Sequence, residues 1–263
     1  MKTVHTAEQL DAHEAFLAEK VFQIYDKWPH FRQLLTWIRK LAETTPAGAT
    51  VVSLERTLLY GGISLVAPFF QRHDFISIDC SPESADRRGA YNVALVDDPR
   101  CIRIAHTHRA DIEATGLGDG VADLVLVPNL VHHVADQDAL FAEMARLLKP
   151  HGRVFVFEPI LRELHQIPDD YIRYTPYGMR SVLSKAGLVP GDFEVEGGPF
   201  QAISYCWIQA LQYFPLEKRT EMERWYFEEH FPQLMEWDND YKDNLLREHT
   251  AFPVSFAITA HKP

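Results

Sequence analysis

Two adjacent histidines follow a short apolar run near the middle of the chain. His132 and His133 come a few residues after the run Leu124 to Val127, and Asn129 lies between the run and the pair. An imidazole titrates near neutral pH, so either ring could take a proton from a reacting group or contact a substrate. The alternative is that the pair packs or caps the start of a helix. Both histidines are therefore candidate catalytic residues.

A second candidate group lies in a polar and aromatic run, Asp170 to Tyr174. In a loop, such a mixture of charges and rings favours binding over packing. The guanidinium of Arg173 could hold a carboxylate through two parallel hydrogen bonds. The alternative is that Arg173 pairs with Glu158 or with the acid at the start of the run and only holds the loop. Together with Arg173, Tyr171 and Tyr174 are candidate catalytic residues.

No metal site is expected from the sequence. His106, His108 and Asp111 form a weak metal-ligand pattern, but the two histidines would alternate across a strand end and no further ligand follows. The three cysteines lie far apart and form no CxxC pair, which argues against a zinc site and against a disulfide framework. It favours a reducing compartment, so we expect a cytoplasmic protein.

The charge of the chain limits its partners. The 263 residues carry a net charge of -11, which repels nucleic-acid phosphates and anionic lipids, and no local stripe of Lys and Arg offsets it. No apolar stretch is long enough to cross a membrane, and Met1 to Lys20 has no signal-peptide core. We therefore expect a small-molecule substrate or a protein partner, and neither nucleic acid nor membrane.

Short, continuous apolar runs recur along the chain, with helical patterns between them. Strands that are buried on both faces have this pattern, and alternation with helices indicates a doubly wound α/β domain with a mostly parallel sheet. The seven expected strands are Val51–Leu54, Phe75–Ile78, Cys101–Ile104, Leu124–Val127, Val154–Phe157, Phe193–Glu196 and Val254–Ala260.

Helical spacing of apolar residues identifies the segments between the strands. Ala7 to Leu41 predicts two N-terminal helices divided by Pro29. Ala139 to Leu148 and Tyr177 to Ala186 predict two more, and the second of these begins after Thr175-Pro176, a typical helix start. The whole chain is expected to form one domain, with N-terminal helices at 1–45 and a core at 50–196 and 253–263.

Residues 197–252 form a helical insertion before the last expected strand. The segment is unusually rich in aromatic residues, more than a surface helix pair needs. We expect either a lid over the carboxyl ends of the strands or an interface with a second copy in a homodimer. An auxiliary helical core is the alternative.

Several linked motifs run from Asp111 to Leu188. They are Ala122–Asn129, Leu130–Val134, Ala145–Val154, Glu158–Pro159 and Arg173–Pro176. This series resembles the class I S-adenosylmethionine (SAM) dependent methyltransferases that act on small molecules, although His151 replaces the first glycine of a usual Gly-Gly pair. The resemblance implies a Rossmann-like, seven-stranded sheet with SAM as the cofactor.

The resemblance also implies a cofactor loop after the first strand. Glu55 matches the acidic residue that ends this strand, and Gly61 matches the last glycine of the turn. Thr57 and Leu59 replace the first two glycines, which in this family let the backbone approach the cofactor. The side chain of Arg56 could supply a contact in place of the lost backbone contacts.

Further residues are implied as cofactor contacts. Asp79 and its neighbour Cys80 would lie at the ribose, where a carboxylate accepts from two hydroxyls; a turn-capping aspartate is the alternative. Asp111 and Ile112 would lie beside the adenine, with an ordinary surface aspartate as the alternative. The remaining implied contacts are Asn129 after the fourth strand and Tyr25, whose alternative is core packing.

The resemblance implies SAM-dependent methyl transfer to a small-molecule acceptor. Two other functions remain open. The chain could be an enzyme of the same fold that cyclises or cleaves SAM and releases methylthioadenosine. It could also be a non-catalytic subunit, although such a subunit has no physical need of Asp79 and Asp111.

Overall fold

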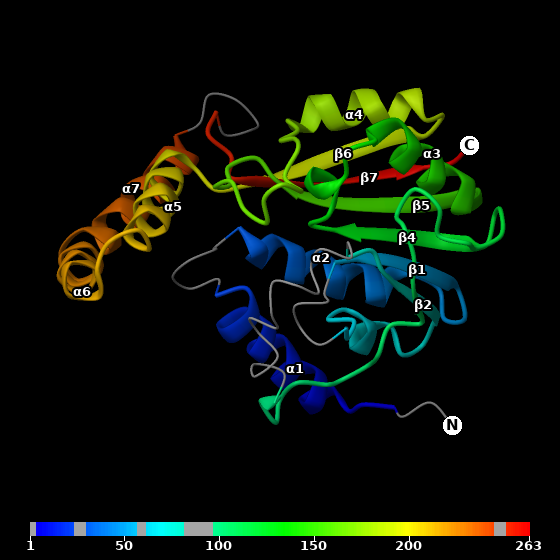
Figure 1. Ribbon diagram of the computed structural model, residues 1–263, viewed down its shortest axis with the longest axis horizontal. Coiled ribbons are helices and arrows are strands. Elements are labelled where there is room, and N and C mark those ends of the chain that lie inside the picture. Colours follow the sequence, from blue (N-terminus) through cyan, green and yellow to red (C-terminus); the bar gives the residue numbers. More distant parts are fainter. Residues whose placement is uncertain (1–3, 24–29, 57–61, 82–96, 245–250) are drawn as a thin grey trace.

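A single mixed sheet forms the centre of the molecule (Figure 1). The computed structural model describes residues 4–23, 30–56, 62–81, 97–244 and 251–263. The seven strands lie in the order β3-β2-β1-β4-β5-β7-β6, and only β7 is antiparallel to its neighbours. They are β1 (Thr50–Glu55), β2 (Asp74–Asp79), β3 (His108–Arg109), β4 (Ala122–Pro128), β5 (Leu148–Pro159), β6 (Val189–Glu196) and β7 (Ser255–His261). The predicted fold class, a mostly parallel Rossmann-like sheet, is confirmed.

The apolar runs form strands because successive side chains enter two different cores. Val51 of β1 and Leu124 of β4 pack with the N-terminal helices, whereas the next residues, Val52 and Val125, pack in the core on the opposite face. Side chains alternate across a strand, so a strand with both faces covered needs apolar residues at every position. This requirement explains the continuous runs in the sequence.

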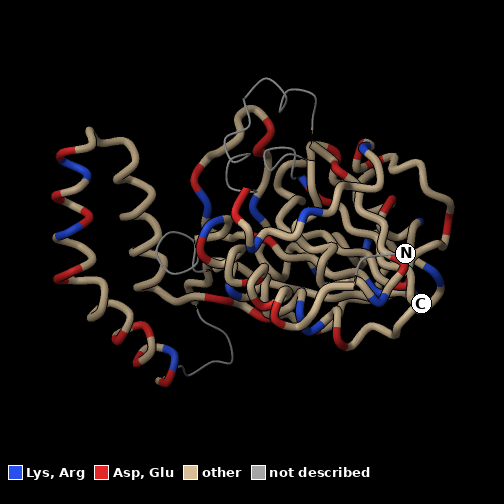
Figure 2. The backbone as a smooth tube through the Cα atoms, turned by 90° about the horizontal axis from the view of Figure 1, so that it is seen from below, with Lys and Arg blue, Asp and Glu red and all other residues tan. Residues whose placement is uncertain are grey.

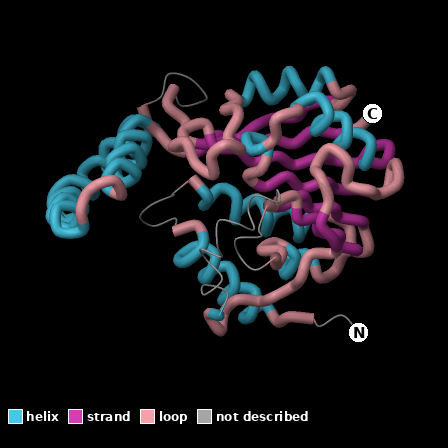
Figure 3. Tube along the Cα trace, viewed as in Figure 1, coloured by secondary structure: helices cyan, strands magenta, loops and turns pink. Residues whose placement is uncertain are grey.

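Helices cover both faces of the sheet (Figure 3). One face carries α1 (Ala7–Phe16), the π-helical turn η1 (Leu17–Val21), α2 (Phe31–Thr44) and the 3-10 turn η3 (Ala67–Phe70). The other face carries α3 (Gln137–Leu147) and α4 (Pro176–Lys185). The helices predicted over 7–41, 139–148 and 177–186 are therefore present, while Pro29 lies outside the described residues. None of the helices in the described ranges is long and apolar enough to cross a membrane.

The predicted strand Cys101–Ile104 is wrong. This segment runs antiparallel to residues 62–64 instead of joining the sheet: Ile63 and Ala105 form an isolated bridge, and the Ser64 N–H donates to the carbonyl of Ile104. The third strand comes a few residues later and is only two residues long, paired with the end of β2. The run has the apolar character of a buried strand because Cys101 packs against the core, but it does so from a loop.

The insertion forms a helical arm that projects beyond one end of the sheet (Figure 1). This arm, residues 199–243, consists of α5 (Pro199–Leu211), α6 (Leu216–Arg224), the π-helical turn η7 (Trp225–His230) and α7 (Phe231–Asp243). No residue of α6 is buried, and charges of both signs alternate along it (Figure 2). At the base of the arm the hydroxyl of Tyr205 donates to Glu163, in the loop after β5. A role for the arm as lid or as interface stays a prediction.

A buried aspartate joins the two long helices of the arm. Oδ1 of Asp238 on α7 accepts from the N–H groups of Phe200 and Gln201 at 3.0 and 3.3 Å, at the start of α5. Replacing Asp238 with Ala should lower the free energy of unfolding by about 1–2 kcal/mol, because two N–H groups lose their cap. Urea denaturation measures this change. The exposed neighbour Asp240 is the control, because no described N–H group is capped by its carboxylate. Equal losses of unfolding free energy in Asp238→Ala and Asp240→Ala would contradict the assignment.

Candidate functional site

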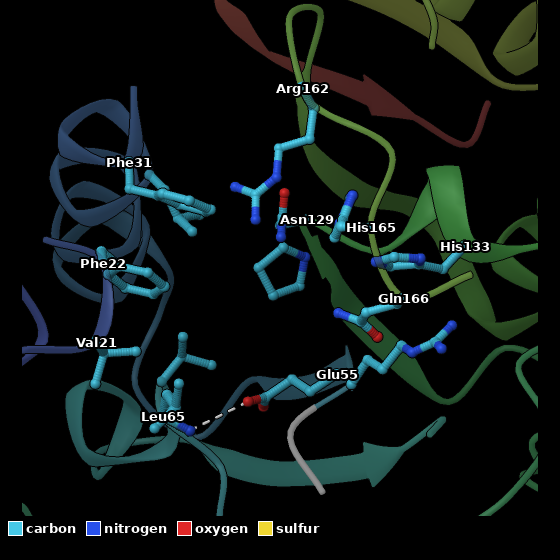
Figure 4. Close-up of a pocket in the computed structure, with 14 residues that line it drawn as sticks. Val21, Phe22, Phe31, Glu55, Leu65, Asn129, His133, Arg162, His165 and Gln166 are labelled. Carbon is cyan, nitrogen blue, oxygen red and sulfur yellow. Dashed lines mark hydrogen bonds between the residues drawn. The ribbon is translucent and has the colours of Figure 1, made fainter. Parts of the chain in front are cut away.

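The candidate site lies where the strand order reverses, between β1 and β4. Chain connections leave these two strands toward opposite sides of the sheet, so a crevice opens at their carboxyl ends, the usual ligand position in such folds. The crevice contains a pocket, here called the inner pocket (Figure 4). Phe22 and Phe31 lie on one side of it, and Arg162, His133 and His165 lie on the other.

A second pocket, here called the outer pocket, adjoins the first. Its lining includes Cys80 after β2, Asp111 and Ile112 after β3, and Leu130 after β4. Two residues, Arg56 and His133, line both pockets. The side chains of Arg56 and His133 therefore lie between the two pockets.

Glu55 closes the floor of the inner pocket at the end of β1 (Figure 4). Its carboxylate is buried and accepts from the hydroxyl of Ser64 at 2.6 Å and from the N–H of Leu65 at 3.2 Å. Burial raises the pKa of the Glu55 carboxyl, and the nearby charge of His106 and these hydrogen bonds partly offset that effect. The acid thus holds Ser64 and Leu65 in place as well as lining the pocket.

A second buried acid, Glu158 near the end of β5, holds the segment that follows β4. One carboxylate oxygen accepts from the N–H groups of Leu130 and Val131 at 2.8 and 2.7 Å. The other accepts from the backbone N–H of His132 at 3.3 Å and from its Nδ1 at 2.6 Å. These bonds fix the 3-10 turn η6 (Val131–His133) and the orientation of the His132 ring. The structure therefore pairs Glu158 with His132, while Arg173 pairs with Asp170.

The loop after β5 folds back over η6. The N–H of Tyr171 donates to the carbonyl of His132 at 2.8 Å, and Nδ1 of His133 contacts the carbonyl of Asp169. His165, from the same loop, lies against both histidines. Burial lowers the pKa of His165 to about 3, with the charge of Arg162 as the next cause. Burial also lowers the pKa of His133 far below 6.5, and His132 and Arg56 lower it further, so this ring is neutral at pH 7.

Most of the predicted site residues lie around the two pockets. Arg56 contacts Asp169 at 3.2 Å and lines both of them. The ring of Tyr171 is half exposed at the rim of the outer pocket. Glu55 and Asn129 line the inner pocket, and Cys80, Asp111 and Ile112 line the outer pocket.

Other predicted residues lie apart from the pockets or outside the described ranges. Oδ1 of Asp79 accepts from the N–H and hydroxyl of Ser81 at 3.0 and 2.5 Å, so this aspartate caps the turn after β2. Arg173 donates to both carboxylate oxygens of Asp170. Tyr174 packs on the core beside Phe141. Tyr25 and Gly61 lie outside the described residues, as do the substituted glycine positions of the cofactor loop.

Three features of the inner pocket could not be found by sequence motifs. Arg162 and Gln166 enter the inner pocket from the loop after β5, whereas the sequence pointed to Asp170–Tyr174 of this loop. The approach of His165 to the histidine pair depends on how this loop folds back. The one available signal was the polar character of the residues that follow Glu158.

Comparison with known proteins confirms the resemblance. Residues 61–156 match the model of the methyltransferase domain family. A dimethylglycine N-methyltransferase from Parasynechococcus marenigrum (strain WH8102) is 32% identical over 143 residues, 49% of this chain and 48% of the relative. The match thus spans about half the length of that relative.

Solved structures show the same fold. A protein from Galdieria sulphuraria, described as a sarcosine dimethylglycine methyltransferase, is similar over 96% of this chain and 98% of its own, with 16% identity and a TM-score of 0.52. Phosphoethanolamine N-methyltransferase 2 from Haemonchus contortus, solved with S-adenosyl-L-methionine, is similar over 100% of this chain and 58% of its own, with 18% identity and a TM-score of 0.50. At these identities the likeness establishes the fold.

A buried histidine behind the inner pocket makes stability depend on pH. His30 packs against Phe31 and Tyr205, and neither ring nitrogen has a hydrogen-bond partner among the residues that the structure describes. Burial lowers the pKa of His30 well below 6.5, and the charge of Arg162 lowers it further. Below pH 6.5 this imidazole binds a proton in the unfolded chain but stays neutral in the folded chain. As the pH falls from 7.5 to 5, the free energy of unfolding should therefore decrease by up to about 2 kcal/mol because of this group.

Replacing His30 with Phe should remove this part of the pH dependence. Urea denaturation at pH 7.5 and pH 5 measures the difference in unfolding free energy for each protein, and the variant should show a smaller difference than the unmodified chain. His261→Phe, at an exposed strand end, is the control and should leave the difference unchanged. A pH dependence in His30→Phe equal to that of the unmodified chain would show that His30 protonates in the folded state.

Proposed function

We propose that this chain, which has a methyltransferase domain and the Rossmann-like fold of SAM-dependent methyltransferases, binds SAM and transfers its methyl group to a small-molecule acceptor. The observation that carries the proposal is the pair of adjoining pockets at the carboxyl ends of β1 and β4, which share Arg56 and His133. Transfer between two ligands requires that their reacting atoms meet, and adjoining pockets provide such a meeting point.

The outer pocket fits the nucleoside part of SAM. Asp111 and Ile112 border it after β3, where a carboxylate can accept from an amino group and a backbone N–H can donate to a ring nitrogen. Cys80 borders it directly after Asp79, at the end of β2. The strands β2 and β3 pair, with Asp79 beside Arg109, so Cys80 and Asp111 would contact the ribose and the adenine from neighbouring strand ends.

The inner pocket fits the amino-acid part of SAM and the acceptor. Oδ1 of Asn129 is buried and has no hydrogen-bond partner among the described residues. An unpaired acceptor of this kind costs about 1–3 kcal/mol, and an ammonium or amine ligand would satisfy it. Asn129 adopts a left-handed backbone conformation (φ 64°), which turns the chain away from β4 at this point. Asn129 is thus positioned to hold an amine.

Bound SAM would supply a methyl group on a positively charged sulfur, ready for transfer to a nucleophile. At the junction of the pockets the positive charge of Arg56 is paired with the carboxylate of Asp169 at 3.2 Å. Burial holds the pKa of His133 far below 6.5, so its ring is neutral at pH 7. The same low pKa makes His133 a weak base, and we assign it to positioning. The acceptor itself would lie against Phe22 and Phe31, whose rings exclude water from the inner pocket.

The acceptor class follows from pocket size and from the relatives. The inner pocket is a small, partly apolar hollow with polar groups from Asn129, Arg162 and Gln166 on one side. A relative of known name acts on dimethylglycine. We infer a small amine as the acceptor.

Calorimetric titration with SAM tests the cofactor assignment. Asp111→Ala should weaken SAM binding about tenfold, equivalent to about 1.4 kcal/mol, because the adenine loses one hydrogen-bond acceptor. Asp192→Ala removes an exposed carboxylate on β6 and is the control. Equal affinities in the two variants would refute the adenine assignment. Absence of any SAM binding to the unmodified chain would refute the proposed function as a whole.

A further inference from the structure

Three histidines from two separate segments converge beside the inner pocket. His132 and His133 belong to η6 after β4, and His165 belongs to the loop after β5. One ring nitrogen from each lies within 4.8 Å of the other two, and Nε2 of His132 lies 3.3 Å from Nε2 of His165. His132 and His133 are buried and His165 is partly buried. Such a group is compact enough to surround one ion.

A protein oxygen holds the Nδ1 atom of each ring. Nδ1 of His132 donates to the carboxylate of Glu158 at 2.6 Å. Nδ1 of His133 donates to the carbonyl of Asp169, and Nδ1 of His165 donates to the carbonyl of Glu163 at 3.0 Å. A carbonyl oxygen only accepts, and an ionised carboxylate only accepts, so all three Nδ1 atoms carry the hydrogen. Each Nε2 atom therefore offers a lone pair.

The facing lone pairs of His132 and His165 need a positive centre between them. Two such acceptors at 3.3 Å repel each other unless a proton or a metal ion lies between them. A proton can join only two nitrogens, whereas the third ring is held in the same way and lies within reach of both. In a tetrahedral site with metal–nitrogen bonds of about 2.0–2.1 Å, two ligand nitrogens are about 3.3–3.4 Å apart. The observed separation of these two atoms already has this value.

We propose that His132, His133 and His165 bind one divalent transition-metal ion of the zinc type through their Nε2 atoms. Imidazole ligands suit zinc, copper, iron and nickel ions better than magnesium or calcium ions. Hydrogen bonds from the second ring nitrogen to a carboxylate or carbonyl are the usual support of metal-bound histidines, and all three rings have one. His132 with Glu158 forms the carboxylate–histidine pair of many zinc sites.

The position of the site gives the ion a function. Three protein ligands leave one coordination position open, as in catalytic rather than structural zinc sites. His133 and His165 also line the inner pocket, so the open position is available to an oxygen, nitrogen or sulfur atom of the acceptor. The ion would hold the acceptor and polarise the atom that it binds. This assignment does not depend on SAM binding.

The site was not expected from the sequence because its ligands follow no short spacing. The pattern considered in the sequence was His106 and His108 with Asp111. Nε2 of His108 instead contacts the carbonyl of Thr115 at 3.1 Å. His165 reaches the pair only because the loop after β5 folds back over η6.

Calorimetric titration of the chelator-treated full chain with Zn²⁺, without SAM or acceptor, tests the site. We expect one ion per chain, and K-edge X-ray absorption of the zinc-loaded protein should show three nitrogen ligands at about 2.0–2.1 Å. His165→Ala and His165→Asn should each weaken zinc binding at least a hundredfold. Glu158→Gln should weaken it about 10- to 100-fold, because the ring of His132 loses its charged partner.

His261→Ala, at an exposed strand end, is the matched control and should bind zinc like the unmodified chain. Circular dichroism verifies that each variant is folded before titration. His165→Asn keeps a polar side chain in the loop, whereas His165→Ala does not. Failure of the unmodified chain to bind one equivalent of zinc would overturn the proposal. Unchanged affinity in a folded His165 variant, or a spectrum without imidazole ligands, would also overturn it. Because SAM is absent, these outcomes are independent of the proposed function.

Discussion

The arrangement of the site depends on one buried carboxylate, that of Glu158. Burying an ionised carboxylate costs several kcal/mol unless hydrogen bonds replace the lost water. Glu158 accepts from three successive backbone N–H groups and from the ring of His132. The register between β4 and β5, which places Pro128 beside Phe157, brings this carboxylate to the N–H groups that follow β4. The strand ladder and the carboxylate therefore fix the segment after β4 together.

Both pockets follow from this fixed segment. With η6 held in place, His133 lies between the outer and inner pockets and Asn129 lies in the inner pocket. The loop after β5 then binds to η6 through the carbonyl of His132 and the ring of His133, and so brings Arg162 and His165 to the same side of the inner pocket as His133. Segments that are distant in the sequence meet because two parallel strands end side by side.

Much of the fold, but only part of the site, could be predicted from the sequence. Strands buried on both faces leave continuous apolar runs, so β1, β2, β4 and β5 were recognisable, whereas β3 is two residues long and leaves no such run. Residues at or just after strand ends, such as Glu55 and Asp111, could be expected to line the pockets because parallel strands bring their carboxyl ends to one edge of the sheet. The partners of Glu158 and the position of His165 depend on tertiary contacts between loops, for which no local pattern exists.

A crystal structure of the protein with S-adenosylhomocysteine tests the central claim most directly, namely that the two adjoining pockets form one site. The account predicts the adenine beside Asp111 and Ile112 in the outer pocket. It predicts the sulfur at the junction marked by Arg56 and His133, and the amino group near Oδ1 of Asn129 in the inner pocket. A nucleoside bound in the inner pocket, or away from the carboxyl ends of β1 and β4, would contradict it.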